Sequence, residues 1–350
     1  MDFSIAAILA QDGITSGAIY ALLALALVLV FSVTRIIFIP QGEFVAFGAL
    51  TLAALQSDKF PHSALLLLLL GVLSFIQETA GVLRSSERRL GAGRSLPLAF
   101  AKFVLFPVAL VLLARTVPGS SLPLVLQVLL ALAIVIPMGP MIYRLAYQPL
   151  AEASVLVLLI VSVGVHYALV GTGLAMFGAE GSRTTPFSDA RFEIGAMTVS
   201  GQSLVIIGVS LALIVALYFY FDRTLSGKAL RATAVNRLGA QLVGIGTTHA
   251  GRTAFTLAVA IGALCGVLIA PLTTIYYDSG FLIGLKGFVG AIIGGMGSYP
   301  IAAAGAILVG LLESYSSFWA SAYKEVIVFT LIIPVLLWRS LTSTHVEEEE

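Results

Sequence analysis

Charged residues and cysteines are scarce in this chain, and both shortages restrict the class of protein. Only 11% of the 350 residues are charged, whereas 59% are hydrophobic and the mean hydropathy is +1.04. A soluble fold of this length could not bury so much apolar surface, so the composition excludes a soluble protein. The single cysteine, Cys265, excludes an intramolecular disulfide. The net charge of +1 carries no information by itself, and we expect no nucleic acid as a partner.

Residue patterns typical of metal, nucleotide and catalytic sites are also missing. The histidines are scattered and form no HExxH motif, so we expect no metal site. They are His62, His166, His249 and His345. No GxxxxGKS/T motif occurs, because Ala229 follows the Gly227-Lys228 pair, and Ser298 has no GxSxG context. We therefore expect no catalytic residue, no cofactor and no nucleotide site in this chain.

Long apolar runs are abundant, and they predict an all-α, polytopic transmembrane helix bundle. A helix needs about 20 residues to cross the hydrocarbon. The predicted spans, nine of them, lie near 14–33, 36–56, 62–83, 98–114, 121–143, 152–177, 202–221, 253–275 and 322–338. We expect a broken or re-entrant helix near 284–313, a single transmembrane domain over 1–340 and a disordered tail at 341–350.

The distribution of basic residues predicts which loops lie in the cytoplasm. Cytoplasmic loops carry an excess of Lys and Arg. If the spans alternate and 222–252 is cytoplasmic, most of the 19 Lys and Arg residues fall in cytoplasmic loops or at their edges. This arrangement places the N-terminus outside and makes 178–201 the longest outer loop.

Residues 222–252 form the only long polar interval in the C-terminal half. Its basic residues are Arg223, Lys228, Arg231, Arg237 and Arg252, and Asp222 is its only acid. Apolar residues recur there at roughly helical spacing, which predicts a short amphipathic helix between two spans. Such a helix on the basic side is a surface that a soluble cytoplasmic partner could bind. The alternative is a solvated loop whose charges only set the topology.

The irregular segment near 284–313 is interrupted by small residues and a proline. The residues of this break are Gly294, Gly295, Gly297, Ser298 and Pro300. Unpaired backbone at membrane depth is tolerated only inside protein or beside a wet cavity, and broken helices recur along transport pathways. The glycines and Ser298 are therefore candidates for a translocation pathway. A plain turn at the outer surface is the alternative, and both stay open.

Glu43 is an acid where a span should begin, next to Gly42. An acid within the membrane indicates a functional site, which makes these two residues further candidates for the translocation pathway. The alternative is an interfacial residue that caps a helix. Pairs of glycines four residues apart indicate helix packing rather than contact with a substrate. These pairs are Gly13/Gly17, Gly262/Gly266 and Gly290/Gly294.

Several motifs together resemble one family of membrane proteins. They are GITSGAIYALLALALVLVFSVTRIIFIPQGEF, RLAYQPL, EGSR, GKALRATAVNRLGAQLVGI and GLKGFVGAIIGGMGSYPIAAAGAILVGLLES. In combination they resemble the branched-chain amino acid ABC transporter permeases of the LivH type, over about 1–75 and 137–340. Residues 76–136 look like an insertion that adds two spans. Gln148 stands where the family has Arg, and IIFIPQGEF keeps only Gly42 and Glu43 of the family's NFAHGEF motif.

The resemblance implies the transmembrane permease subunit of an ATP-binding-cassette importer in a bacterial inner membrane. Its expected substrates are branched-chain or other amphipathic amino acids. Its expected partners are a second homologous permease, two cytoplasmic ATPases that use the ATP, and a periplasmic substrate-binding protein. Urea, short amides or aromatic acids are alternative substrates within the same superfamily, and a passive channel is a further alternative.

The resemblance also gives residues 222–252 a mechanism, because they become the cytoplasmic coupling loop on which the ATPases dock. Gly227 is then an N-terminal hinge, and Arg231 and Asn236 are polar contacts. Leu230, Leu238 and Leu242 form the apolar face, and Gly244 follows that face.

Overall fold

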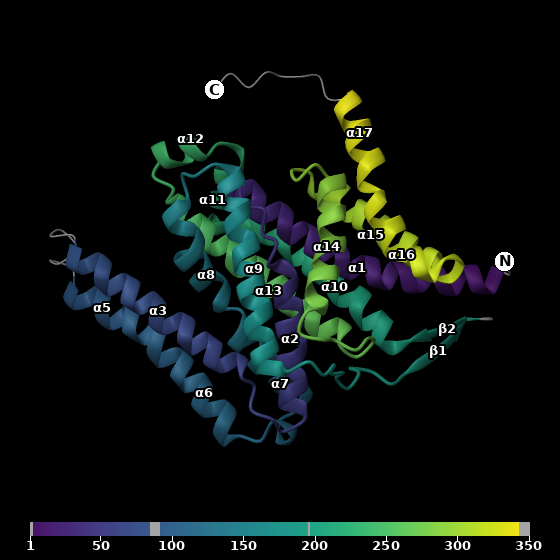
Figure 1. Ribbon diagram of the computed structural model, residues 1–350, viewed down its shortest axis with the longest axis horizontal. Helices are drawn as coiled ribbons and strands as arrows, with labels where there is room; N and C mark the ends of the chain where they lie inside the picture. Colours follow the sequence, from purple (N-terminus) through teal and green to yellow (C-terminus); the bar gives the residue numbers. More distant parts are fainter. Residues whose placement is uncertain (1–2, 85–91, 195–196, 343–350) are drawn as a thin grey trace.

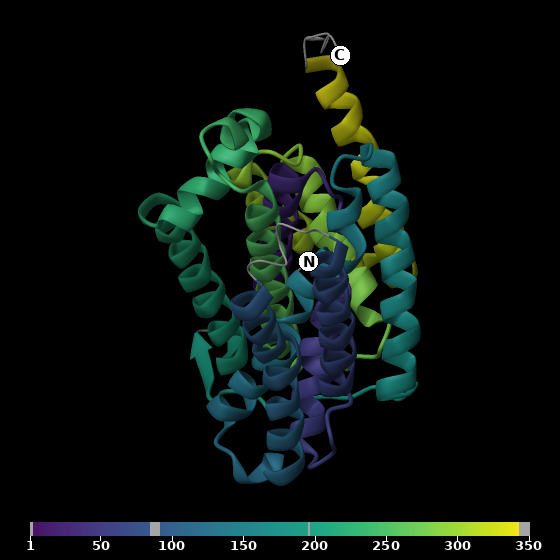
Figure 2. The same cartoon turned by 90° about the vertical axis from the view of Figure 1, so that its left-hand side faces the viewer.

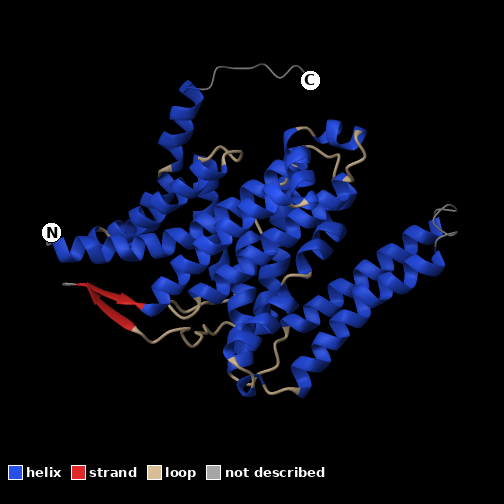
Figure 3. Ribbon diagram, turned by 180° about the vertical axis from the view of Figure 1, so that it is seen from behind, coloured by secondary structure: helices blue, strands red, loops and turns tan. Residues whose placement is uncertain are grey.

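The computed structural model describes residues 3–84, 92–194 and 197–342, and it is a bundle of helices (Figures 1 and 3). The only strands in these ranges are β1 (Arg191–Ile194) and β2 (Met197–Ser200), which pair as an antiparallel hairpin. Among the described residues, nine helices are long and apolar enough to cross a membrane. The predicted all-α polytopic bundle is confirmed.

The helices follow one another along the whole chain. Their bounds are α1 Phe3–Thr34, α2 Gln41–Gln56, α3 Ser63–Arg84, α5 Ala92–Phe100, α6 Phe106–Thr116, α7 Leu124–Val135, α8 Met138–Ile142, α9 Val155–Phe177, α10 Gly201–Arg223, α11 Leu225–Val235, α12 Arg237–Leu242, α13 Thr247–Ile269, α14 Ser279–Ile293, α15 Tyr299–Trp319, α16 Lys324–Thr330 and α17 Ile332–Thr342. One turn of π-helix joins α5 to α6, and another follows α8. Of the predicted tail, 343–350 lies outside the described residues.

The predicted spans and the observed ones differ in one member. The apolar run 36–56 contains α2, which has only 16 residues and is too short to cross a bilayer alone. Helix α2 is short because Pro40 precedes it, and proline disfavours helical backbone in the residue before it. A different helix completes the nine. It is α15, a full-length helix of 21 residues that begins within the segment predicted to be broken and ends six residues beyond it, at Trp319.

The centre of the bundle is built from α1, α2, α13, α14 and α15, which pack closely because glycines face one another. A Cβ on Gly310 would overlap the backbone of Gly13 and Gly17, and one on Gly266 would overlap the carbonyl of Val45. The interpretation of the paired glycines as packing residues is confirmed. Helices α5 and α6 continue one another as one span, and α3 lies beside them at the edge of the bundle (Figures 1 and 2).

The loops gather at two opposite ends of the bundle. At one end, which we call the basic end, Arg237 Nη1 donates to the carbonyl of Ala151 at 3.1 Å, and Ser32 Oγ donates to the carbonyl of Met296 at 3.4 Å. The basic end comprises 144–153, 222–252 and 294–298. At the other, the hairpin end, the N–H of Thr185 donates to Gln56 Oε1 at 2.9 Å. The hairpin end comprises 57–62, 117–123, 178–194, 197–200 and 270–276.

This sorting agrees with the alternation of spans that the sequence predicts. The predicted basic loop 84–94 lies mainly outside the described residues. Its neighbour Glu78 forms an ion pair with Arg144, so the C-terminal part of α3 also lies toward the basic end.

Candidate functional site

The segment from α11 to α12 stands at the basic end and is held by side-chain caps. Thr224 Oγ1 accepts a hydrogen bond from the N–H of Gly227 at 2.9 Å and caps α11. Asn236 ends α11 and begins α12, where its Oδ1 accepts from the N–H of Gly239 at 2.8 Å. Gly244, with φ +85°, ends the segment in a left-handed conformation that glycine adopts without strain. We call residues 224–246 the coupling segment.

Large apolar side chains on the coupling segment project away from the bundle. Leu225, Val235 and Leu242 are at least 80% exposed, and Leu238 and Val243 are exposed as well. Exposed apolar side chains grouped in this way mark a surface that interacts with a protein partner or with the membrane. The prediction that Leu238 and Leu242 lie on one exposed apolar face agrees with this geometry.

Leu230 was predicted to lie on the exposed apolar face with Leu238 and Leu242, and that prediction is wrong. It is 1% exposed and packs against Leu29, Val33, Ala250 and Ala254 in a small core under α11. Residues three apart share a helix face, so Gly227, Leu230 and Thr233 form the inner side of α11. The exposed apolar face uses Leu225, Val235, Leu238 and Leu242 instead, and Leu230 anchors it.

The other predicted contacts of the coupling segment are placed as follows. Gly227 lies at the start of α11, where a Cβ would overlap the carbonyl of Tyr220 on α10. Glycine therefore permits the close approach of α11 to the end of α10. Whether this point also acts as a hinge stays a prediction. Arg231 is half exposed and lies 3.6 Å from Asp222, a weak surface pair. The Oδ1 of Asn236 is already used by the helix cap.

A second set of candidate residues lies where two short helices meet inside the bundle. Helices α2 and α14 begin beside each other, and a Cβ on Gly42 would overlap the carbonyl of Gly280 and crowd Gly284. Gln41 Nε2 donates to the carbonyl of Ala258 at 2.8 Å, which ties the start of α2 to the middle of α13. Helix N-termini carry partial positive charge, so this meeting point favours an anion.

Glu43 places a carboxyl group at this point, because it lies in the first turn of α2, and the group is fully buried. His166 on α9 places its Nδ1 at 3.0 Å from Glu43 Oε1. Asp278, next to the first residue of α14, brings a second acidic side chain near Glu43. Within the described ranges, no group of three or more His, Cys, Asp or Glu residues could hold a metal ion.

The predicted break at Gly294–Ser298 is a tight turn between α14 and α15. Gly295 and Met296 have φ of +63° and +56°. The N–H of Met296 donates to the carbonyl of Ala291 at 2.9 Å, and that of Ser298 donates to Gly294 at 3.1 Å. The turn lies at the basic end, where Ser32 near the end of α1 donates to the carbonyl of Met296. Its backbone groups are paired locally because the left-handed residues close the helix end.

The six candidates for a translocation pathway are therefore not brought together. Gly42 and Glu43 lie at the N-terminus of α14, and Gly294, Gly295, Gly297 and Ser298 lie beyond its C-terminus. The 15 residues of α14 separate the two groups by about 22 Å.

One buried group of charged residues was not predicted from the sequence. Lys286 on α14 is paired with Glu313 at 2.5 Å and Glu325 at 3.3 Å, and Tyr20 donates to Glu313 at 2.6 Å. The signal available was a lysine within an apolar run, which requires a buried partner.

Comparison with known proteins identifies the relatives of this bundle. Residues 91–336 match the family model described as the permease component of branched-chain amino acid transport systems. The chain belongs to this family. The match begins within 76–136, and the interpretation of that segment as an insertion stays a prediction.

Three relatives illustrate the similarity. The permease protein BraD of a Pseudomonas aeruginosa high-affinity branched-chain amino acid transport system is 29% identical over 229 residues, which are 63% of this chain and 75% of BraD. The corresponding LivH of Escherichia coli K12 is 29% identical over 59% of this chain and 70% of its own length. A probable LivH of Methanocaldococcus jannaschii is 28% identical over 56% and 67%. No solved structure matches the chain.

Proposed function

We propose that the chain is the membrane subunit of an ATP-driven importer for branched-chain or other amphipathic amino acids. Family membership and relatives named for branched-chain amino acid transport support the substrate class. In this proposal the membrane is a bacterial inner membrane, the basic end faces the cytoplasm, and the N-terminus lies outside. The excess of Lys and Arg at the basic end supports this orientation.

The observation that carries the proposal is the exposed apolar face of the coupling segment. Leu238 and Leu242 stand beside basic side chains on a short helix that is anchored to the bundle by Leu230. An amphipathic helix of this kind fits a groove on a soluble partner. The proposed partner is a pair of ATPases, which bind and use the ATP, so this subunit carries no catalytic residue and no cofactor.

The coupling segment is linked to other helices by polar contacts. Arg237 donates to the carbonyl of Ala151 and lies 3.5 Å from Glu152, just before α9. Arg252 in the first turns of α13 donates to Gln148 Oε1 at 2.9 Å. A displacement of α11 and α12 by closing ATPases would therefore reach α9, α10 and α13 together, which is how a rigid element transmits movement.

The remaining parts of the proposed importer follow from this orientation. A second homologous permease packs beside this subunit, and a periplasmic binding protein delivers substrate to the hairpin end. Gly42 and Glu43 are the proposed pathway residues, because they lie where two helices begin inside the bundle. Gly294, Gly295, Gly297 and Ser298 are proposed to form the pathway's limit at the basic end.

Co-purification with the ATPases tests the proposal. Leu238→Asp with Leu242→Asp places two charges on the apolar face, and we expect the amount of bound ATPase to fall at least tenfold, as for central interface residues. The matched control is Phe192→Asp, which charges an exposed apolar residue on β1 at the hairpin end. If the double variant retains as much ATPase as the control, the coupling segment is not the docking surface.

A further inference from the structure

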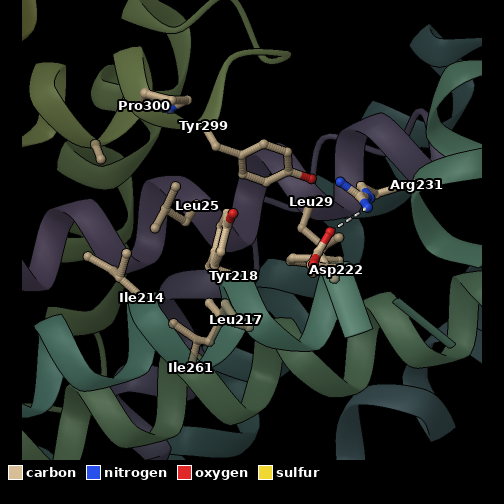
Figure 4. A pocket seen from close by; sticks show the side chains of 12 residues that line it. Leu25, Leu29, Ile214, Leu217, Tyr218, Asp222, Arg231, Ile261, Tyr299 and Pro300 are labelled. Carbon is tan, nitrogen blue, oxygen red and sulfur yellow. Dashed lines mark ion pairs between the residues drawn. The ribbon is translucent and has the colours of Figure 1, made fainter. Parts of the chain in front are cut away.

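A cavity of about 400 Å³ lies between α1, α10, α13 and α15, directly below the coupling segment (Figure 4). Its walls are apolar side chains. They include Leu25, Leu29, Ile214, Leu217, Ile261 and Ala303. Helices α1 and α10 are both long enough to cross the membrane, so these walls lie within the membrane-spanning part of the bundle.

The cavity has a polar mouth at the basic end. Figure 4 shows Asp222 and Arg231 at this mouth, joined as an ion pair, with the ring of Tyr299 extending toward Arg231. The lining on α10 runs from Asp222 back to Ile214, which is about 12 Å along a helix. The cavity is therefore charged at the membrane surface and apolar below it.

Charge at the mouth is not balanced. Arg223 and Arg231 share one carboxylate, that of Asp222, at 3.3 and 3.6 Å. One positive charge is left over, and Lys228 is exposed three residues before Arg231 on the same helix face. Basic clusters of this kind, between membrane helices and next to the membrane surface, attract anionic lipid headgroups.

The shape and surroundings of the cavity indicate that its occupant is an apolar chain. Water needs two to four polar partners, and among the side chains that line the cavity below its mouth only Tyr218 carries a polar group. Protein interiors are normally packed without voids of this size. Tyr218 lines the cavity and is 68% exposed, so the cavity opens on the side of α10 where Leu211 and Phe219 are also exposed. An acyl chain from the bilayer can enter through this opening.

We propose that this cavity binds one anionic phospholipid, with an acyl chain against α1, α10 and α15 and the phosphate beside Arg231. Such a lipid joins the end of α10 to α11 and α15 at the basic end. Lipid binding here requires only this chain, and it holds whether or not an ATPase binds the coupling segment.

Native mass spectrometry of the chain purified alone in detergent tests the proposal. After exposure to phosphatidylglycerol, we expect one lipid to remain bound, with much weaker retention of phosphatidylcholine that has the same acyl chains. Arg231→Gln removes the positive charge nearest the cavity and leaves that of Lys228, so retention of phosphatidylglycerol falls about fivefold. Ala303→Leu fills the apolar part and lowers retention to the level of phosphatidylcholine. The control Arg191→Gln removes a basic residue at the hairpin end and leaves retention unchanged.

Three results would overturn the proposal. Equal retention of the two phospholipids removes the role of the headgroup charge. Equal binding of glycerol phosphate without acyl chains removes the role of the cavity. Loss of chain–chain association in Ala303→Leu, with lipid retention unchanged, identifies the occupant as a second protein chain. The ATPase test uses Leu238 and Leu242, which do not line this cavity, so the two proposals fail independently.

Discussion

The ammonium group of Lys286 lies 2.5 Å from Glu313 Oε1, and both side chains are largely buried between α14 and α15. Glu325 at the start of α16 lies 3.3 Å from the same ammonium group. Tyr20 on α1 donates a hydrogen bond to the second oxygen of Glu313. Helices α1, α14, α15 and α16 are thus joined by one cluster of polar side chains inside an apolar bundle. Each buried charge in the cluster is stabilised by its partners.

Lys286→Met leaves Glu313 and Glu325 without their cation, so we expect the free energy of unfolding to fall by about 3 to 5 kcal/mol. Glu313→Leu should lower the free energy of unfolding by a similar amount. The double variant Lys286→Met/Glu313→Leu removes both buried charges, and its loss should be well below the sum of the two single losses. Thermal unfolding in detergent measures all three proteins. Additive losses would show that the two groups do not interact.

Gly42→Ala tests the meeting point of α2 and α14. The added Cβ overlaps the backbone of Gly280, which cannot move away without displacing α14. We expect a loss of about 1 to 3 kcal/mol in stability. Gly164→Ala on α9 is the matched control, because a Cβ there meets no atom within 4 Å. Since alanine is the better helix former, the control variant should be more stable by about 0.5 to 1 kcal/mol. Equal effects of the two changes would contradict this packing.

Asn236→Ala removes the side chain that caps α12. The N–H of Gly239 then loses its acceptor, and helix caps of this kind contribute about 1 kcal/mol. We expect faster hydrogen exchange over 237–243 while exchange in α13 stays unchanged. Asn236→Asp keeps an acceptor and should restore the slow exchange. Unaltered exchange in Asn236→Ala would mean that α12 is held by other contacts.

Asp58 gives the hairpin end a pH dependence. Hydrogen bonds from the side chain and backbone of Ser120 lower the pKa of Asp58 below its ordinary value of 3.8. Because the folded pKa is the lower one, the stabilisation is complete above pH 3.8 and is lost as the pH falls through the folded pKa. Asp58→Asn should reduce the loss of melting temperature on acidification. The same acid sensitivity in this variant would assign the effect to other carboxyl groups.

Local patterns were sufficient to predict most of the helices and the two ends of the bundle. Long apolar runs, a polar interval and the positions of Arg and Lys are all properties of neighbouring residues, and they gave the alternation of loops. The break at Gly294–Ser298 was located correctly for the same reason. The sequence left its depth open, because depth depends on where α14 begins, and α14 begins beside Gly42 on α2.

Contacts between distant residues could not be read from the sequence. Leu230 and Leu238 have the same side chain, and only the position of α1 and α13 decides that Leu230 is buried. His166 lies beside Glu43 although 123 positions separate them, which follows from how α2 and α9 pack. Lys286 and Glu313 meet only because the turn between α14 and α15 folds these helices against each other.

The short helix α2 has a consequence for how the protein is made. Gln41 binds the carbonyl of Ala258 and Gly42 packs on Gly280, so the N-terminal end of α2 meets these two neighbours only after more than 200 further residues have been synthesised, whereas α7 is available sooner. Until then the first turn of this 16-residue helix, which carries Glu43, lacks the contacts with α13 and α14 that enclose it. The N-terminal end of α2 is therefore synthesised early and reaches its native packing late.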